Sequence, residues 1–137
     1  QPIEKLPQLL AVGDVHLVIQ KAEAADLVMP SKLTNILAAG RPVIATAEEG
    51  TGLYEVITKY NLGVIGKSNN AEDLVGNILT LSKSAEIRKS IGDKSREYAV
   101  RYINKENVLK EFEEKLQKLS NDILNVNVGS PSNMNKI

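Results

Sequence analysis

The sequence predicts an α/β domain built around a parallel sheet. Three short runs of apolar and β-branched residues, at positions 14–20, 43–47 and 64–65, are typical of strands buried on both faces. Stretches with helical periodicity separate these runs, and strands that alternate with helices pair in parallel. A doubly wound sheet has about five or six strands, so we expect only part of one, without its first strand-helix units.

Composition excludes several classes of function. The 137 residues suffice for a single domain with a hydrophobic core. Lysine plus arginine and aspartate plus glutamate each number 17, so no charge excess points to nucleic acid or an anionic membrane. With no cysteine and one histidine, we expect no disulfide framework, no thiolate metal site and no histidine-rich metal cluster. No apolar run is long enough to span a bilayer and no signal peptide opens the chain, so we expect a cytoplasmic protein.

The first 20 residues predict a short helix followed by a strand. Apolar residues at helical spacing cover 3–12, and Gly13 ends the pattern. The run 14–20 then predicts a strand that is covered on both faces. His16 lies inside that run without a sequence neighbour that would orient it as a base, so we interpret it as a packed core or edge residue.

The next helix follows a loop, an arrangement at which phosphate groups commonly bind. Residues 21–29, which include Asp26, are predicted to form the loop. Pro30 suits the first turn of the helix, and Ser31 is predicted to cap the same end. A cation such as Lys32 in the first turn opposes the helix dipole by about 0.3–1 kcal/mol. An anionic ligand at this point would make the net interaction of Lys32 favourable. If the lysine instead points into solvent, water screens its unfavourable interaction with the dipole. The local pattern leaves both interpretations open.

This helix ends at a glycine and leads into the second strand. Gly40 suits the left-handed conformation that follows a helix. After the strand at 43–47, the loop Gly50–Gly52 contains two glycines that would let the backbone approach a ligand, or would simply form a turn. The helix face that we expect to be buried consists of Leu33, Ile36, Leu37 and Ala38.

The second half of the chain predicts further helices. Asn70 is predicted to be the N-cap of a helix that begins at Ala71. We expect the apolar face of this helix to be buried. Another helical stretch begins at Ser84 and contains Gly92, which weakens it. The buried face of the first of these helices is predicted to consist of Leu74, Val75, Ile78 and Leu79.

The last helix is expected from Asn104 to Leu124. Its apolar stripe is short of the three or four heptads that identify a coiled coil. The polar stretch 125–137 predicts a disordered tail, which leaves 1–124 as the folded domain. The stripe consists of Val108, Leu109, Phe112, Leu116, Leu119 and Ile123.

Three stretches carry a family resemblance: LPQLLAVGDVHLVIQ, ADLVMPSKLTNILAAGRPVIAT and GTGLYEVITKYNLGVIG. They resemble the C-terminal domain of family 4 glycosyltransferases of the GT-B fold. The phrase PSKLTNILAAGRPVIAT is most similar to the colanic-acid or exopolysaccharide branch of the bacterial enzymes. The resemblance runs from Leu6 to Leu124. It implies a partial Rossmann-like domain that binds a nucleotide-diphosphate sugar, with a separate N-terminal domain for the acceptor.

The resemblance also implies where the donor binds. Lys32 would neutralise the diphosphate as the leaving group departs, which is a catalytic role. Glu55 matches the glutamate of a Pro-Glu-Val-type segment, although a first-turn glutamate also suits the helix dipole without a ligand. The implied donor-binding positions are Ser31, Lys32, Leu33, Asn35, Gly50, Thr51, Gly52, Glu55 and Asp26.

One family feature is missing from this sequence. Many relatives carry two glutamates eight residues apart, and the corresponding positions here hold Leu27 and Asn35. Asp26 is the nearest carboxylate. Asn35 can form hydrogen bonds to a ribose but carries no charge.

The resemblance implies a retaining sugar transfer that requires no metal and no cofactor, to a polysaccharide or lipid-linked acceptor. A lipid-linked acceptor would place the protein at the inner face of the membrane. We expect the 137-residue chain to be inactive without an acceptor domain, supplied in cis or as a separate chain. The alternative is a non-catalytic nucleotide-binding or protein-interaction module. A receiver-like signalling domain lacks its acidic cluster here, and PSKLTN favours a transferase over an epimerase of the same fold.

Overall fold

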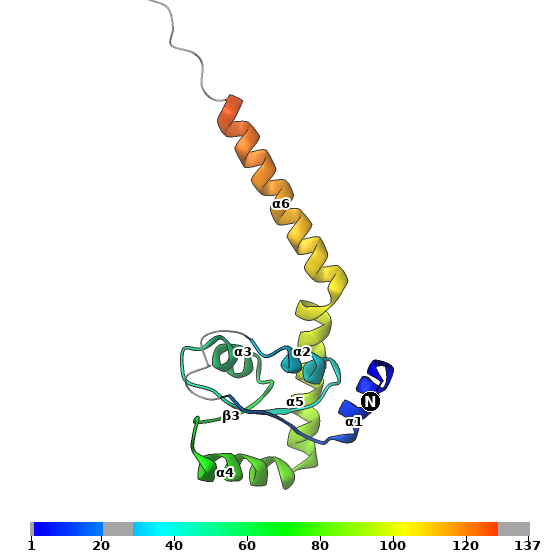
Figure 1. The fold of residues 1–137 in the computed structure, drawn as a ribbon, viewed down its shortest axis with the longest axis vertical. Coiled ribbons are helices and arrows are strands. Elements are labelled where there is room, and N and C mark those ends of the chain that lie inside the picture. The colour runs from blue at the N-terminus through cyan, green and yellow to red at the C-terminus, as the bar shows by residue number, and fades with distance from the viewer. Residues whose placement is uncertain (1, 21–28, 129–137) are drawn as a thin grey trace, which may run out of the picture. The chain divides into compact units, whose positions relative to one another are not determined.

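Helices and strands alternate along the chain as the sequence predicts. The computed structural model describes residues 2–20 and 29–128 (Figure 1). The chain forms two compact units, with the boundary between Ile103 and Asn104. The elements are a 3₁₀ helix Ile3–Lys5, α1 Leu6–Val12, β1 His16–Val18, α2 Ser31–Ala38, β2 Val43–Thr46, α3 Gly52–Tyr60, β3 Gly63–Gly66, α4 Ala71–Ser82, α5 Ala85–Tyr98, a π-helical turn Ala99–Ile103 and α6 Lys105–Val128.

The three strands form a parallel sheet in the order β1-β2-β3. Val18 pairs with Ala45, and Ala45 pairs with Ile65. β2 is therefore central, and all four of its residues are buried, as its continuous apolar sequence predicts. The predicted fold class is confirmed: the first unit is α/β, with a parallel sheet consistent with part of a Rossmann-like domain.

The core lies between the sheet and the helices α2 and α3. Figure 1 shows these two helices on one side of the sheet and α4 on the other. Alternate residues of β2 face the two sides, so Val43 and Ala45 join the core cluster. The prediction for Ala38 is wrong, because its position at the end of α2 leaves it exposed beside α1. The helical members of the core are Leu33, Ile36, Leu37, Leu53 and Ile57.

β1 is less buried than its sequence predicts. The strand covers only His16–Val18, and the side chain of Leu17 is 41% exposed. β1 is one of the two edge strands of the described sheet, and α4 packs mainly against β2 and β3. The prediction that this strand is covered on both faces is therefore wrong for the part of the chain that the structure describes.

The uncovered face of β1 also explains why the apolar face of α4 is exposed. We expected the apolar face of α4 to be buried, but Val75, Ile78 and Leu79 are exposed and Leu81 is the fully buried residue. Ile78 faces a hollow of about 440 Å³ that Leu17 and Ile44 also line. Periodicity identified the apolar face correctly, but the described residues supply nothing that covers it.

A cluster of tyrosines joins α3 to the end of α5. The ring centroids of Tyr60 and Tyr98 lie 4.7 Å apart, and those of Tyr98 and Tyr102 lie 4.9 Å apart. Tilted rings at this spacing are a favourable aromatic contact. Burial, together with Tyr60 and Tyr102, raises the pKa of the Tyr98 hydroxyl above its usual value.

The last helix forms the described part of the second unit. The side chain of Asn104 accepts a hydrogen bond from the Glu106 amide, which confirms the predicted start. The helix continues to Val128, four residues beyond Leu124, so residues 125–128 are helical and not part of a disordered tail. Gly129 follows Val128 directly in the sequence, and a glycine after the last helical residue is the end signal that the prediction did not use. Residues 129–137 lie outside the described part. None of the described helices is both long and apolar enough to cross a membrane.

Two glycines allow a close approach between α5 and the turn after α2. Gly40 has a φ of +66°, as predicted for the residue that follows the helix. A Cβ atom built on Gly92 would lie 2.4 Å from the carbonyl oxygen of Gly40. Gly92 is therefore required by packing, which its helical pattern does not reveal.

We expect Gly92→Ala to lower the free energy of unfolding by about 1–3 kcal/mol, because the methyl group must displace the Gly40 carbonyl. Gly76→Ala is the matched control, since a Cβ there meets nothing within 4 Å. Helix propensity alone predicts that the control stabilises the protein by about 0.5–1 kcal/mol. Urea denaturation measures both changes, and stabilisation by both substitutions would contradict the close contact.

Candidate functional site

The carboxyl ends of the strands define one edge of the sheet. Because the strands are parallel, β1, β2 and β3 end side by side at Val18, Thr46 and Gly66. The helices α2, α3 and α4 begin from the loops that follow these ends. In open α/β sheets, ligands bind at this edge. The positions predicted for the donor at the starts of α2 and α3 lie there.

The start of α2 offers backbone donors. Pro30 occupies the N-cap position, so the prediction that Ser31 caps the helix is wrong, and Ser31 is the first helical residue. The Leu33 amide donates to the Pro30 carbonyl at 2.9 Å. Among the described residues, no hydrogen bond uses the N–H groups of Ser31 and Lys32. As far as the described residues extend, two donors at the positive end of the helix dipole are thus unused.

Lys32 places a positive charge at the same point. Its Nζ donates a hydrogen bond of 3.3 Å to the carbonyl oxygen of Leu17, and the side chain is exposed. No carboxylate in the described part of the chain forms an ion pair with it. The ammonium group is therefore held across the end of β1 with no balancing carboxylate from residues 2–20 or 29–128, a position suited to an anion.

The start of α3 adjoins the start of α2. A Cβ atom built on Gly52 would lie 3.9 Å from Cε of Met29, the residue before Pro30. Gly50 has a φ of +86° and completes the turn into the helix. The Thr51 side chain caps α3 by accepting from the Tyr54 amide at 3.4 Å. The structure thus brings two helix N-termini together at one edge of the sheet.

The remaining predicted residues have different positions. Glu55 is exposed in the first turn of α3, where it suits the helix dipole, and its role toward a ligand stays a prediction. The Leu33 side chain is buried in the core, so it anchors α2 and does not face solvent. Asn35 lines a hollow of about 300 Å³ between α1 and α2. Asp26 lies outside the described residues.

Side chains that the sequence did not single out hold the loops at this edge. Thr46 Oγ1 accepts from the Gln20 amide and donates to the Gln20 carbonyl, both at 2.9 Å. The Glu48 carboxylate accepts from the Ser68 amide at 3.3 Å. A polar residue at the end of a buried strand was the available signal for Thr46. These bonds fix where the loop after β1 begins and tie the loops after β2 and β3 together.

A hollow of about 600 Å³ lies between α3 and the outer side of β3. It is lined by residues of both charges, including Glu48, Lys67 and Asp73, and by none of the predicted donor residues. Asp73 is already engaged, because its carboxylate accepts from the Lys67 amide at 2.7 Å. This hollow includes Ala47, Glu48 and Glu49 of the loop that leads into α3, so it lies at the same edge of the sheet, on the side of β3.

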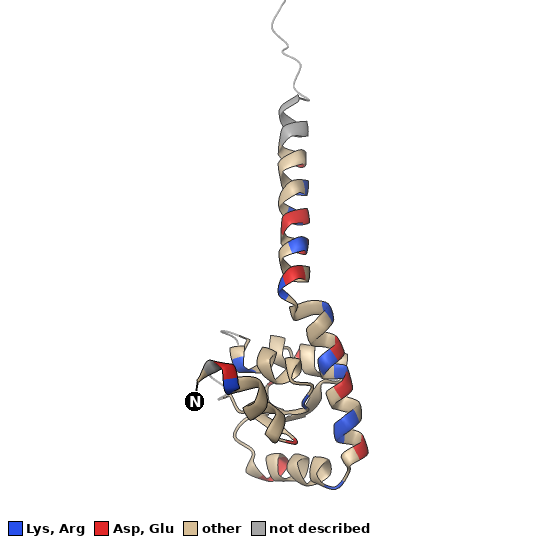
Figure 2. Cartoon of the chain, turned by 90° about the vertical axis from the view of Figure 1, so that its right-hand side faces the viewer, with Lys and Arg blue, Asp and Glu red and all other residues tan. Residues whose placement is uncertain are grey.

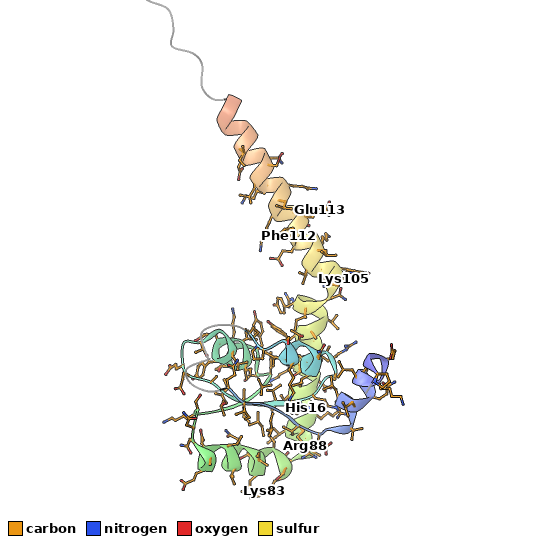
Figure 3. All side chains as sticks on the ribbon, viewed as in Figure 1. His16, Lys83, Arg88, Lys105, Phe112 and Glu113 are labelled. Atoms are coloured by element: carbon orange, nitrogen blue, oxygen red, sulfur yellow. The ribbon has the colours of Figure 1, made fainter. Side chains whose placement is uncertain are left out.

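His16 has a structural role, as the sequence predicts. Its Nε2 lies 2.8 Å from the carbonyl oxygen of Leu10 and donates to it, which ties β1 to α1 (Figure 3). It stands at the amino end of β1, away from the edge with the helix N-termini. The described residues contain no group of three or more acidic or histidine side chains that could hold a metal ion.

Residues 4–98 match the family of group 1 glycosyl transferases. The chain belongs to this glycosyltransferase family. The match extends from the 3₁₀ helix to the end of α5, so it includes the sheet and both helix N-termini. The family resemblance carried by the three quoted stretches is thereby confirmed.

Two curated proteins are similar to parts of the chain. WcaI, a putative colanic acid biosynthesis glycosyl transferase of Escherichia coli strain K12, is 42% identical over 113 residues, which is 82% of this chain and 27% of that protein. An uncharacterized glycosyltransferase of Methanocaldococcus jannaschii is 38% identical over 66 residues, which is 48% of this chain and 18% of that protein. The chain thus spans a minor part of each relative's length. No solved structure gives a significant match.

We expect Thr46→Val to lower the free energy of unfolding by about 1–3 kcal/mol, because both polar groups of the Gln20 backbone lose their partner. Thr80→Val is the control, since the Thr80 hydroxyl donates within exposed α4 to the Gly76 carbonyl at 2.9 Å. That change should stay within about 0.5 kcal/mol. Thermal melts of the two variants make the comparison, and equal effects would contradict a clamp at Thr46.

Proposed function

We propose that this chain is the donor-binding part of a glycosyltransferase. It holds a nucleotide-diphosphate sugar with the diphosphate at the N-termini of α2 and α3. The observation that carries the proposal is the exposed Lys32 ammonium beside two backbone N–H groups, all three without an acidic or hydrogen-bonding partner at the helix start other than the Leu17 carbonyl among the described residues. Membership of a glycosyltransferase family supports a sugar nucleotide as the source of that diphosphate.

Charge explains why the diphosphate belongs at this point. Lys32 in the first turn of α2 is unfavourable toward the helix dipole when the site is empty. A diphosphate adds negative charge between the ammonium and the helix N-terminus, so both interactions become attractive. The start of α3 adds a second positive helix end, because Gly52 lies beside Met29.

The same charges favour transfer of the sugar. As the bond from the sugar to the diphosphate breaks, negative charge grows on the leaving phosphate and positive charge grows on the sugar. Lys32 stabilises the negative charge on the leaving phosphate, and the departing phosphate balances the positive charge on the sugar. Because this positive charge is balanced from the leaving-group side, the acceptor adds on that side and the anomeric configuration is retained. No metal is needed for this step.

The acceptor follows from the relative's name alone. The similarity to the E. coli protein, described as acting in colanic acid biosynthesis, supports a polysaccharide or a lipid-linked saccharide as the acceptor. We further propose that an acceptor-binding domain, in cis or as a separate chain, is required for transfer. The open side of β1 and the small share of the relative's length that the chain spans both support this requirement.

A thermal-shift panel with UDP, GDP, ADP and inorganic phosphate tests the donor site. We expect one nucleoside diphosphate to raise the melting temperature, by an amount equivalent to about 2.7 kcal/mol at a concentration of 100 Kd. Lys32→Ala should weaken that ligand by about 10–100-fold, because a charge-assisted hydrogen bond is lost. A shift that is the same in Lys32→Ala would place the ligand elsewhere, and no shift with any nucleotide would refute the proposal.

Lys83→Ala is the matched control for the lysine substitution. Lys83 is exposed at the end of α4, on the opposite face of the sheet from α2 (Figure 3). The substitution of Lys83 removes one positive charge and leaves the proposed site unchanged. The ligand shift should therefore be unchanged in this variant.

The purified chain should transfer no sugar on its own. The assay supplies the nucleotide sugar that binds and a panel of saccharide acceptors, and measures release of the nucleoside diphosphate and formation of glycosylated product. Addition of an acceptor domain from a relative should restore transfer. Product formed by the chain alone would contradict the requirement for a second domain.

The second candidate is a non-catalytic nucleotide-binding or protein-interaction module. The replacement of the glutamate pair by Leu27 and Asn35, together with the position of Asn35 beside α1, favours it. Such a module would bind the nucleotide through Lys32 in the thermal-shift panel. It would still give no transfer after the acceptor domain is added, which separates the two proposals.

A further inference from the structure

β3 is an edge strand of the described sheet, and a hollow follows its open side. This hollow of about 600 Å³ is lined by Gly63, where β3 begins, and by Gly66, where β3 ends. Residues of the flanking helices α3 and α4 complete the lining. A strand of this length measures about 13 Å at the usual rise per residue. The hollow is therefore a groove with the length of a short extended peptide, which we call the β3 groove.

The backbone on the open side of β3 has no partner among the described residues. The Val43 amide donates to the Leu62 carbonyl at 3.3 Å, so β2 bonds to Leu62 and to every second residue after it. Gly63 and Ile65 lie between these residues, and their N–H and C=O groups therefore point away from β2. No hydrogen bond within residues 2–20 and 29–128 uses these groups. They form the donor and acceptor pattern with which an added strand pairs.

The two helices give the β3 groove walls of different chemistry. α3 contributes the apolar side chains of Tyr54 and Ile57, whereas α4 contributes Asp73 and Asn77. Asn77 Nδ2 is buried without a hydrogen-bond partner, and a Cβ atom built on Gly66 would lie 3.1 Å from it. Successive side chains of a strand point to opposite faces. An added strand would thus place alternate residues against the apolar side chains of α3 and the polar side chains of α4.

The charge of the β3 groove favours a basic partner. Among the described residues that line it, the carboxylates of Glu48, Glu49 and Asp73 outnumber the single ammonium group of Lys67. The first turn of α4 is acidic, as its red residues in Figure 2 show. A second copy of β3 would bring two sets of carboxylates together, and like charges across an interface are unfavourable. Lysine or arginine side chains would instead meet opposite charge.

We propose that β3 binds an extended, basic segment of another protein as an additional strand. The backbone of that segment pairs with Gly63 and Ile65, which supplies affinity whatever its sequence. Its apolar side chains contact α3, and its lysine or arginine side chains contact Asp73 on α4. Alternate apolar and basic residues are therefore the pattern that the β3 groove selects. Lys32 does not line the groove, so the contact does not depend on the donor site.

A blocked hexapeptide that alternates lysine and valine is the probe. Its titration into the ¹⁵N-labelled 137-residue chain, up to about 1 mM, covers the weak affinity expected of so small a contact. We expect saturable shifts of the Gly63 and Ile65 amide signals, and at least about tenfold weaker binding when glutamate replaces lysine. No shift, equal binding of the glutamate peptide, or shifts confined to other amides would overturn the proposal. Signals that change with the concentration of the free chain would assign the groove to a second copy and would also overturn it.

Methylation of the peptide backbone tests strand pairing. In a paired strand, the amides of alternate residues face the same neighbour. One version of the probe is N-methylated at every lysine and the other at every valine, so one version blocks the amides that face β3 and the other leaves them free. We expect one version to bind like the probe and the other to bind at least about tenfold more weakly. Equal binding of the two versions would rule out an added strand.

A charge substitution in the β3 groove tests the choice of partner. Asp73→Asn keeps an oxygen for the Lys67 amide and removes the charge, so the lysine peptide should bind about two- to fivefold more weakly, the range of an exposed ion pair. A peptide with glutamine in place of lysine should bind both forms equally. Glu86→Gln is the matched control, because Glu86 is exposed in the first turn of α5 and does not line the groove. Thermal melts verify that both variants stay folded, and equal losses in the two variants would contradict contact with Asp73.

Discussion

The pairing of β2 with a parallel strand on each side is the constraint on which the first unit depends. Since the three strands run in one direction, their carboxyl ends meet at a single edge, and the helices that follow begin there. The close contact between Gly92 and Gly40 then fixes α5 against the turn that feeds β2. No local motif creates the candidate site. The direction of the sheet does, because it brings together helix ends from separate parts of the chain.

Features set by neighbours along the chain were predictable from the sequence. β2 was identified because an apolar, mostly β-branched run suits a strand with a neighbour on each side. Gly40 was identified because a helix that ends before a strand needs a left-handed residue. The family was identified because PSKLTNILAAGRPVIAT joins these local signals in a fixed order. In each case the physical cause lies within a few residues of the signal.

Features set by distant neighbours were not predictable. Leu17 and Val75 have the composition of buried residues, yet their exposure depends on which elements cover them. The clamp between Thr46 and Gln20 joins residues 26 positions apart, and the contact of Lys32 with the Leu17 carbonyl spans 15. The periodicity of a single sequence reports only on neighbours within a few residues, so it cannot indicate contacts between residues this far apart in the chain. The same limit explains why Gly92 was interpreted as a weakness of its helix, and not as the site of a close contact.

The edge position of β1 has a consequence for the mobility of the candidate site. β1 has a ladder of hydrogen bonds on one side and an open face below, so its amides should exchange with solvent through local opening at a lower cost than those of β2. Lys32 and Thr46 both attach to residues in or next to this strand. The candidate site is thus coupled to an edge strand of the sheet. A ligand that orders this edge would use part of its binding free energy to suppress the local opening of β1. Its binding would then be seen as slower amide hydrogen exchange in that strand.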